Sequence, residues 1–192
     1  MKITYQRVIA FFLLIALSVG FGFAFDGIAT ALEKRQYPKV ASLEAAITET
    51  AREFGLPETV LWAAIQTESN FVSSAVSDHG EVGLMQLTPE LFTHICTQVL
   101  GEEQMDHGML YDPVTNLRCG AAWISHLYQR YGVWETVFAA YHAGTDQVDA
   151  WLSDPTLVTP QGTLQIPDAA TKNQVDRMVK AVKKYSQLYY QA

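Results

Sequence analysis

The sequence lacks the features that would indicate a metal site or a nucleic-acid partner. Only two of its 192 residues are cysteines, they form no CxxC pair, and the histidines have no spacing typical of metal ligands. The net charge is −7, whereas proteins that bind nucleic acid present basic surfaces. We therefore expect no metal, no cofactor and no nucleic-acid partner.

The two cysteines, Cys96 and Cys119, allow two interpretations. One is a pair of buried thiols on neighbouring helices, because free cysteine behaves as a small hydrophobic residue. The other is a disulfide, which requires that the domain lie outside the cell. The sequence leaves both open.

Repeats, low-complexity tracts and sustained period-2 alternation are also absent, while 49% of the residues are hydrophobic. That composition supports a folded core and excludes a disordered chain. The periodicity from Ser42 onward is helical, so we predict an all-α fold. The helices are expected at 42–54, 57–69, 117–131 and 134–143, with a last one starting near Asp168.

Local signals predict where these helices begin and end. Gly55, Gly132 and Gly144 are expected to stop helices, and Asn116 is expected to be an N-cap. Residues 71–89 should form one irregular region. Residues 157–166 contain proline and glycine, which predicts a loop or a small hairpin.

The N-terminal region predicts export. Residues 8–25 carry no charge, and as a helix of ~1.5 Å per residue they would span roughly 27 Å, close to a bilayer core. Lys2 and Arg7 precede this run and Asp26 follows it. Positive residues stay on the cytoplasmic side, so the rest of the chain should be extracytoplasmic.

We predict that residues 1–25 are an uncleaved signal anchor with one transmembrane helix, which makes the protein a single-pass protein of the cytoplasmic membrane. Residues 26–41 would then be a linker, and residues 42–192 the helical domain. The alternative is a signal peptide cleaved after a small-residue site, Gly22-Phe23-Ala24, which would give a secreted protein.

Glu68 is the first candidate functional residue. The apolar stripe of helix 57–69 runs through Leu61, Ala64 and Ile65, and its next member is Glu68. Burial and the negative end of the helix dipole should both raise the pKa of this carboxyl. A carboxylic acid that stays protonated near neutrality can protonate the leaving oxygen of a glycosidic bond.

The segment after Glu68 has the composition of a ligand-binding loop. Gly80 and Gly83 precede Leu84, Met85 and Gln86, and glycines beside bulky residues suit a backbone that lies close to a ligand. The Gln86 amide offers both an acceptor and a donor for an N-acetyl group or a sugar hydroxyl.

Taken together, Glu68-Ser69-x-Phe71 and Ala75-x-Ser77-x-x-Gly80-x-x-Gly83-Leu84-Met85-Gln86-Leu87-x-Pro89 resemble the signature of the soluble lytic transglycosylase family, which belongs to the goose-lysozyme-like superfamily. Further matches follow in the family's order. They are Asn116-Leu117 with Gly120, the run Ala139-Ala140-Tyr141-His142-Ala143-Gly144, and Ile166-Pro167 followed by Thr171 and Val175.

The resemblance implies a lysozyme-like helical domain that acts on peptidoglycan glycan strands. The bond between N-acetylmuramic acid and N-acetylglucosamine would be cleaved without water, leaving 1,6-anhydro ends, with Glu68 as the single catalytic acid and base. The resemblance implies that Ser77, Met85, Gln86 and Tyr141 bind the substrate. We add their neighbours Gly83, Leu84 and His142 as further substrate-binding candidates.

The sequence also departs from the family pattern. His142 replaces an asparagine, and it is either a tolerated polar exchange or a histidine that titrates beside the groove. Ala170 and Gln174 stand where the family usually has a glutamate and a tyrosine. Glu81 replaces an alanine, and it is either a solvated loop charge or a groove carboxylate. We expect His79 to be a surface or packing residue.

Two alternative functions remain. A goose-type muramidase would add water and would need a second carboxylate, for which Asp78 and Glu81 are the nearby candidates. A catalytically weak wall-binding or assembly module would explain the departures at Ala170 and Gln174. The retained carboxyl of Glu68 weighs against that second alternative.

Overall fold

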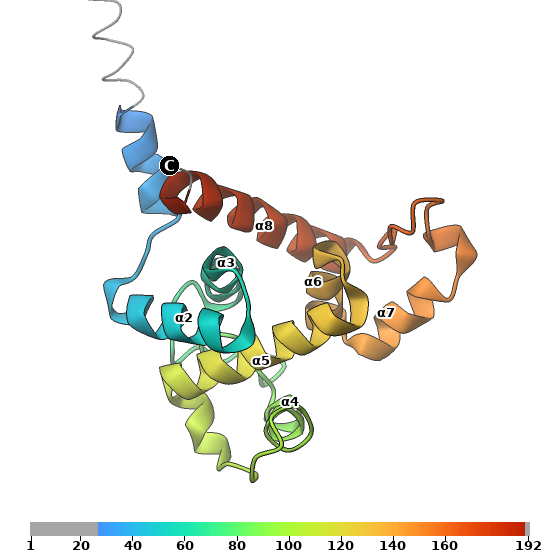
Figure 1. The fold of residues 1–192 in the computed structure, drawn as a ribbon, viewed down its shortest axis with the longest axis horizontal. Helices are drawn as coiled ribbons and strands as arrows, with labels where there is room; N and C mark the ends of the chain where they lie inside the picture. The colour runs from blue at the N-terminus through green and yellow to red at the C-terminus, as the bar shows by residue number, and fades with distance from the viewer. Residues whose placement is uncertain (1–26, 191–192) are drawn as a thin grey trace, which may run out of the picture. The chain divides into compact units, whose positions relative to one another are not determined.

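The computed structural model describes residues 27–190, and within that range the regular secondary structure is helical (Figure 1). The chain divides into two compact units, one ending at Pro38 and one running from Lys39 onward. Pairing between extended segments is limited there to isolated bridges. The predicted all-α class is therefore confirmed for the described residues.

The second unit contains seven α-helices among its described residues. They are α2 (Ala41–Phe54), α3 (Glu58–Ser69), α4 (Pro89–His94), α5 (Pro113–Tyr131), α6 (Trp134–Ala143), α7 (Thr145–Leu152) and α8 (Ala169–Tyr185). Short helical segments also occur at Ile95–Val99, His107–Tyr111, Pro155–Leu157 and Ser186–Tyr190.

Helix α3 is the centre of this unit. Its residues from Val60 to Ile65 are all at most 1% exposed, so the helix is buried on every side along that stretch and not only on the predicted stripe. Helices α2 and α8 pack against α3, and α8 also crosses α6 (Figure 1). Burying an apolar helix in this way fixes the position of its C-terminal end.

Glycines end three helices as predicted. Gly55 and Gly132 adopt the left-handed conformation after α2 and α5, with φ of 65° and 69°. Gly144 ends α6 with φ of 85°. These backbone angles are unfavourable for residues with a side chain. At the start of α8, the carboxylate of Asp168 accepts a hydrogen bond from the Thr171 N–H, so the predicted start of that helix is also confirmed.

The predicted N-cap at Asn116 is wrong. Helix α5 begins earlier, at Pro113, and its N-cap is Asp112, which accepts a hydrogen bond from the Thr115 N–H at 2.8 Å. Proline suits the first helical turn because its missing N–H would have no partner there. Asn116 lies inside the helix and is fully buried, and its amide bonds a separate loop.

Several helical segments were not predicted. Helix α7 follows Gly144 directly, and the segment from α4 to residue 111 contains short helical turns. Each is too short to show a clear apolar period. Residues 27–36 are helical as well, inside the segment expected to be a linker. The linker role and the domain boundaries stay predictions.

The two irregular regions agree with expectation. Residues 71–88 form a loop held by isolated bridges that join Val82 to Val76 and to Leu87. Val158 pairs with Leu164, which makes the segment around Gly162 a small hairpin. Both cysteines are buried and free, which matches the first of their two interpretations.

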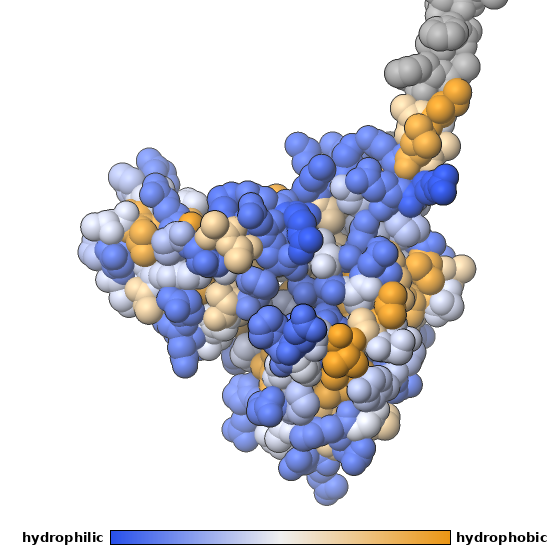
Figure 2. All heavy atoms as spheres, turned by 180° about the vertical axis from the view of Figure 1, so that it is seen from behind, coloured by the Kyte–Doolittle hydropathy of each residue, from blue (hydrophilic) through white to orange (hydrophobic). Residues whose placement is uncertain are grey.

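No helix within residues 27–190 is long and apolar enough to cross a membrane. The predicted transmembrane helix falls in residues 1–25, outside the described range, and it stays a prediction. On the face shown in Figure 2, the surface of the second unit is mostly hydrophilic, and its apolar atoms form small separate groups.

Candidate active site

A polar groove of about 560 Å³ surrounds Glu68. Its walls come from the C-terminal end of α3, the 71–88 loop, the end of α6 and the first turns of α8. The lining residues are Thr67, Glu68, Ser77, His79, Glu81, Gln86, His142, Gln174 and Arg177. Side chains from four parts of the chain that are distant in sequence therefore meet around one carboxyl.

The end of α3 delivers Glu68 to this groove. The helix stops at Ser69, and Asn70 and Phe71 both adopt left-handed backbone angles, with φ of 49° and 67°. Two consecutive non-glycine residues with left-handed backbone angles are unusual, and strained conformations of this kind cluster at functional sites. The sharp stop leaves Glu68 in the last turn, half-buried, with its carboxyl at the groove.

Asn116 holds the loop that forms the opposite wall. Its carbonyl oxygen accepts a hydrogen bond from the Met85 N–H at 2.7 Å, and its amide donates to Val82 O and Leu110 O, both at 2.9 Å. The loop also packs closely, because a Cβ on Gly83 would lie 2.3 Å from the Asn116 amide nitrogen. Only glycine fits at that position.

The backbone of the loop presents Gln86 in a single orientation. Gln86 has a left-handed backbone (φ 49°), and its side-chain nitrogen donates to Gly83 O at 2.9 Å and to Ala75 O at 3.3 Å. Both of its N–H groups are therefore used inside the loop. The side-chain carbonyl oxygen of Gln86 remains as an acceptor, so this residue suits a ligand that donates a hydrogen bond.

The remaining residues of the predicted groove lie behind this surface. Leu84 and Met85 are at most 1% exposed, and Gly83 is buried. Tyr141 donates its hydroxyl proton to the backbone oxygen of Met85 at 2.7 Å. The structure thus brings Glu68, Ser77, Gln86 and His142 to the groove and places Gly83, Leu84, Met85 and Tyr141 in its support.

Electrostatics agree with the expected state of Glu68. Burial is the largest effect and raises the pKa of this carboxyl to about 7. A hydrogen bond from Gln174 lowers it, the charge of Glu81 raises it, and the charge of Arg177 lowers it. Glu68 therefore titrates near neutral pH rather than near pH 4.5, which suits a group that must both donate and accept a proton.

Glu81 lies in the groove as a second carboxylate. It is half-buried, and its carboxylate accepts a hydrogen bond from the Ser77 hydroxyl at 2.9 Å. The Ser77 oxygen in turn accepts bonds from the N–H groups of His79 and Glu81. Of the two interpretations of Glu81, the structure therefore favours the groove carboxylate over a fully solvated loop charge.

Sequence reasoning missed four groove residues. His79 lines the groove instead of serving only as a surface or packing residue, and Thr67, Gln174 and Arg177 also line it. One signal was available for Arg177, which lies one helical turn after the unusual Gln174. Thr67 and His79 gave no comparable signal.

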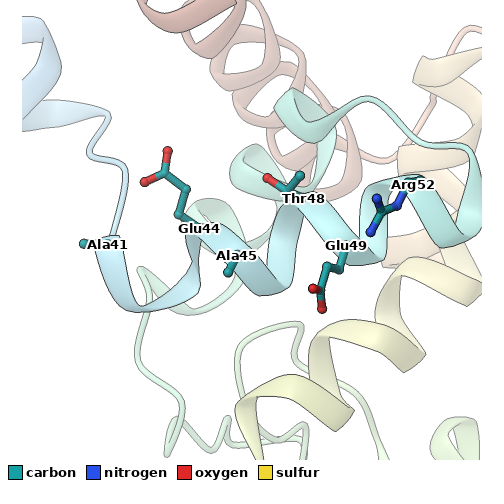
Figure 3. A pocket seen from close by; sticks show the side chains of 6 residues that line it. All are labelled: Ala41, Glu44, Ala45, Thr48, Glu49 and Arg52. Atoms are coloured by element: carbon teal, nitrogen blue, oxygen red, sulfur yellow. The ribbon is translucent and has the colours of Figure 1, made fainter.

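A second hollow differs in kind. It has a volume of about 520 Å³ and lies along α2, where Figure 3 shows its lining side chains arranged on one helix. These residues are Ala41, Glu44, Ala45, Thr48, Glu49 and Arg52. No residue from another element converges on them in that lining, so the groove at Glu68 is the candidate active site.

Comparison with known proteins identifies the family of the domain that carries this groove. Residues 45–157 match the family model described as the transglycosylase SLT domain. The chain is 32% identical over 101 residues to the soluble lytic murein transglycosylase of Escherichia coli K12, an alignment that covers 52% of this chain and 16% of that protein. It is 31% identical over 86 residues to the membrane-bound lytic murein transglycosylase C of Yersinia enterocolitica, covering 44% and 24% respectively.

Solved structures show the same fold. The lytic transglycosylase Slt of Pseudomonas aeruginosa, solved as an inactive mutant with glutamine in place of a glutamate, superposes with a TM-score of 0.70 at 27% identity, over 80% of this chain and 25% of that one. The 70 kDa soluble lytic transglycosylase of Escherichia coli superposes with a TM-score of 0.73 at 23% identity, over 82% and 26%. The family match covers more than half of the sequence, and the chain therefore belongs to the transglycosylase SLT domain family.

Proposed function

We propose that this chain is a peptidoglycan lytic transglycosylase in which Glu68 is the single acid and base. The observation that carries the proposal is a half-buried glutamate with a pKa of about 7 in a polar groove of an SLT domain. The chain covers only 16% of the length of its Escherichia coli relative. The activity is therefore proposed for this domain on its own geometry.

The proposed reaction has two proton transfers. Protonated Glu68 gives its proton to the oxygen that links N-acetylmuramic acid to N-acetylglucosamine, while the 2-acetamido oxygen attacks the anomeric carbon. The Glu68 carboxylate then takes the proton of the O6 hydroxyl, and O6 displaces the acetamido oxygen to close the 1,6-anhydro ring. Water is not consumed, and Glu68 returns to its starting state.

The substrate-binding roles follow from the positions of the groups. Ser77, Gln86 and His142 line the groove and are proposed to contact the sugars directly. Gly83, Leu84, Met85 and Tyr141 are proposed to act through the loop backbone that they pack and bond. The inactive mutant of the Pseudomonas aeruginosa relative, in which a glutamate is replaced by glutamine, supports the choice of an acid as the central group.

Product analysis tests the reaction. Purified peptidoglycan digested by the protein is expected to release muropeptides with 1,6-anhydro-muramoyl ends. Mass spectrometry should show each of them lighter than the hydrolysis product by one water molecule, about 18 Da. A goose-type muramidase is the second candidate, favoured by Glu81 in the same groove. Reducing ends in the digest would establish that second candidate and contradict ours.

We also propose that residues 1–25 anchor the domain on the outer face of the cytoplasmic membrane. The uncharged run at 8–25 supports this, as does the relative named as membrane-bound. N-terminal sequencing of the protein from native membranes is expected to give a start before residue 8. A mature start at Phe25 or Asp26 would establish cleavage and contradict the anchor.

A further inference from the structure

Gln174 is the side chain that hydrogen-bonds the Glu68 carboxyl in the described part of the chain. Its nitrogen Nε2 donates to Glu68 Oε1 at 2.9 Å. Gln174 lies in the second turn of α8 and is only 6% exposed, and α8 packs directly against α3. The contact is therefore held by the packing of two helices rather than by a mobile surface side chain.

Arg177 determines which way the Gln174 amide points. One turn further along α8, the Arg177 guanidinium donates to Gln174 Oε1 through Nη2. A guanidinium has only donors, so it requires the oxygen of the amide to face it. The amide nitrogen must then face Glu68, because the flipped amide would bring its N–H groups against the guanidinium and its oxygen against the carboxyl.

We propose that Gln174, held by Arg177, is a positioning residue that keeps the transferable proton of Glu68 on Oε2. The proposal rests on the proposed role of Glu68 as acid and base. An oxygen that accepts an N–H bond is the carbonyl oxygen of a protonated carboxyl, so Oε1 takes that role and Oε2 carries the hydrogen. After the first transfer both oxygens are acceptors, and the Gln174 bond then stabilises the carboxylate.

The same oxygen of Glu68, Oε2, therefore takes part in both proton transfers. In the first, the O–H bond at Oε2 breaks and the proton passes to the glycosidic oxygen, which keeps the electron pair of the broken C–O bond. In the second, Oε2 receives the O6 proton as O6 bonds the anomeric carbon. Oε1 stays bonded to Gln174 throughout, so the carboxyl does not need to rotate between the steps.

Other charged and titratable groups also face Glu68, and the test must separate their effect from that of the amide. They are Glu81 and His79 from the loop, Tyr141 and His142 from α6, and Arg177 from α8. Burial and the charge of Glu68 raise the pKa of Tyr141 well above its usual value, so its hydroxyl remains protonated and bonded to Met85 O.

Two substitutions disrupt the proposed positioning of the Glu68 proton in different ways. Gln174→Met keeps the length of a buried side chain but has no donor, and Arg177→Met, at an exposed position, frees the amide to turn its oxygen toward the acid. Lys180→Met is the matched control, because it removes another exposed cation of α8 that does not line the groove. Arg177→Lys keeps a donor-only cation and should restore the amide orientation.

The direct measurement is the titration of Glu68 by carboxyl carbon NMR in glutamate-labelled protein, with Glu68→Gln to assign the signal. Loss of a hydrogen bond to the charged form should move the Glu68 titration upward by about one pH unit or more in Gln174→Met. We expect a rise in the same direction in Arg177→Met, a titration close to wild type in Arg177→Lys, and no change in Lys180→Met.

Cleavage of purified peptidoglycan gives the second readout. Activity falls as Glu68 loses its proton, so the alkaline limb of the pH profile should move upward together with the NMR titration. At pH 5, where Glu68 is protonated in every variant, Gln174→Met should still be slower by about tenfold because the proton is no longer held on Oε2. Lys180→Met should match wild type at both pH values.

The outcomes separate this inference from the proposed function. If the wild type cleaves peptidoglycan and the Glu68 titration does not move in Gln174→Met, the positioning role is wrong while the function stands. Equal upward movement in Arg177→Met and Lys180→Met would assign the effect to general charge and also overturn it. A wild type that cleaves nothing defeats the proposed function, whereas the titrations still decide whether Gln174 and Arg177 control the acid.

Discussion

Replacing Glu68 by glutamine is expected to lower peptidoglycan cleavage by about 10²–10⁴-fold, the usual contribution of general acid–base catalysis. Glutamine has nearly the same shape and also offers a carbonyl oxygen to Gln174, so the groove is retained. It cannot release a proton to the glycosidic oxygen or accept one from O6. Turnover of purified peptidoglycan near neutral pH, close to the pKa of Glu68 in the wild type, measures the loss.

The same substitution should stabilise the fold at alkaline pH. Glu68 has a folded-state pKa of about 7, raised from 4.5. A raised pKa means that the folded protein holds this proton more tightly than the unfolded chain, so the associated stability is present below pH 4.5 and is lost as the pH rises to 7. Above that range the buried carboxylate costs at most about 3 kcal/mol. Glu68→Gln should therefore unfold at higher urea concentration than wild type at pH 8 and at a similar concentration at pH 4.

Glu49→Gln is the matched control for both measurements. Glu49 is an exposed glutamate of α2, outside the candidate active site (Figure 3). Its substitution should change neither cleavage nor the pH dependence of unfolding, because surface substitutions rarely exceed about 0.5 kcal/mol. Near-wild-type cleavage by Glu68→Gln would remove the only acid from our mechanism. If neither the wild type nor Glu68→Gln cleaved peptidoglycan, the result would instead favour a wall-binding or assembly module.

The helical framework could be predicted from the sequence because apolar periodicity and glycine stops are local signals. Gly55, Gly132 and Gly144 end their helices as expected. The position of Glu68 was predictable for the same reason, since α3 is apolar on the face that leads to it. Helix α7 escaped prediction because Thr145–Leu152 is barely two turns long.

The errors concern residues whose partners are distant in sequence. Asn116 has the side chain of a good N-cap, but its amide bonds residues 31 and 34 positions earlier. In the sequence, Gln174 only indicates the loss of an aromatic residue, whereas in the structure it bonds Glu68 across 106 positions. A single sequence carries no local signal for such pairs. The hydrogen-bond capacity of a polar side chain is visible in the sequence, but the group that satisfies it depends on the tertiary fold.

Asn116→Ala is expected to destabilise the protein by about 3 kcal/mol or more, a large part of the stability of a small domain. The substitution removes the partner of the Met85 N–H and that of Leu110 O, while Val82 O keeps its bond from the Leu87 N–H. Each buried group left without a partner costs about 1–3 kcal/mol. The urea midpoint of unfolding measures this loss.

Two further variants show whether the cost comes from the hydrogen bonds. Asn116→Asp keeps the volume and the acceptor for Met85 but loses both donated bonds and buries a charge, so it should be at least as unstable as Asn116→Ala. Asn173→Ala, at an exposed position of α8, should change the free energy of unfolding by no more than about 0.5 kcal/mol. A midpoint for Asn116→Asp close to wild type would show that the two donated bonds contribute little.

Activity should fall with the loop even where the variant remains folded. Met85 is tied to Asn116 through its N–H and to Tyr141 through its oxygen, and Gln86 follows it directly. Without Asn116 the backbone loses one of these two fixed points, and the Gln86 carbonyl oxygen no longer holds one position against the substrate. At low temperature, where Asn116→Ala is folded, we expect KM for glycan strands to rise by about tenfold, while the Glu68 titration stays in place. A folded Asn116→Ala protein with wild-type KM would show that the loop keeps its shape without this side chain, and that the three bonds of Asn116 stabilise the domain but do not shape the groove.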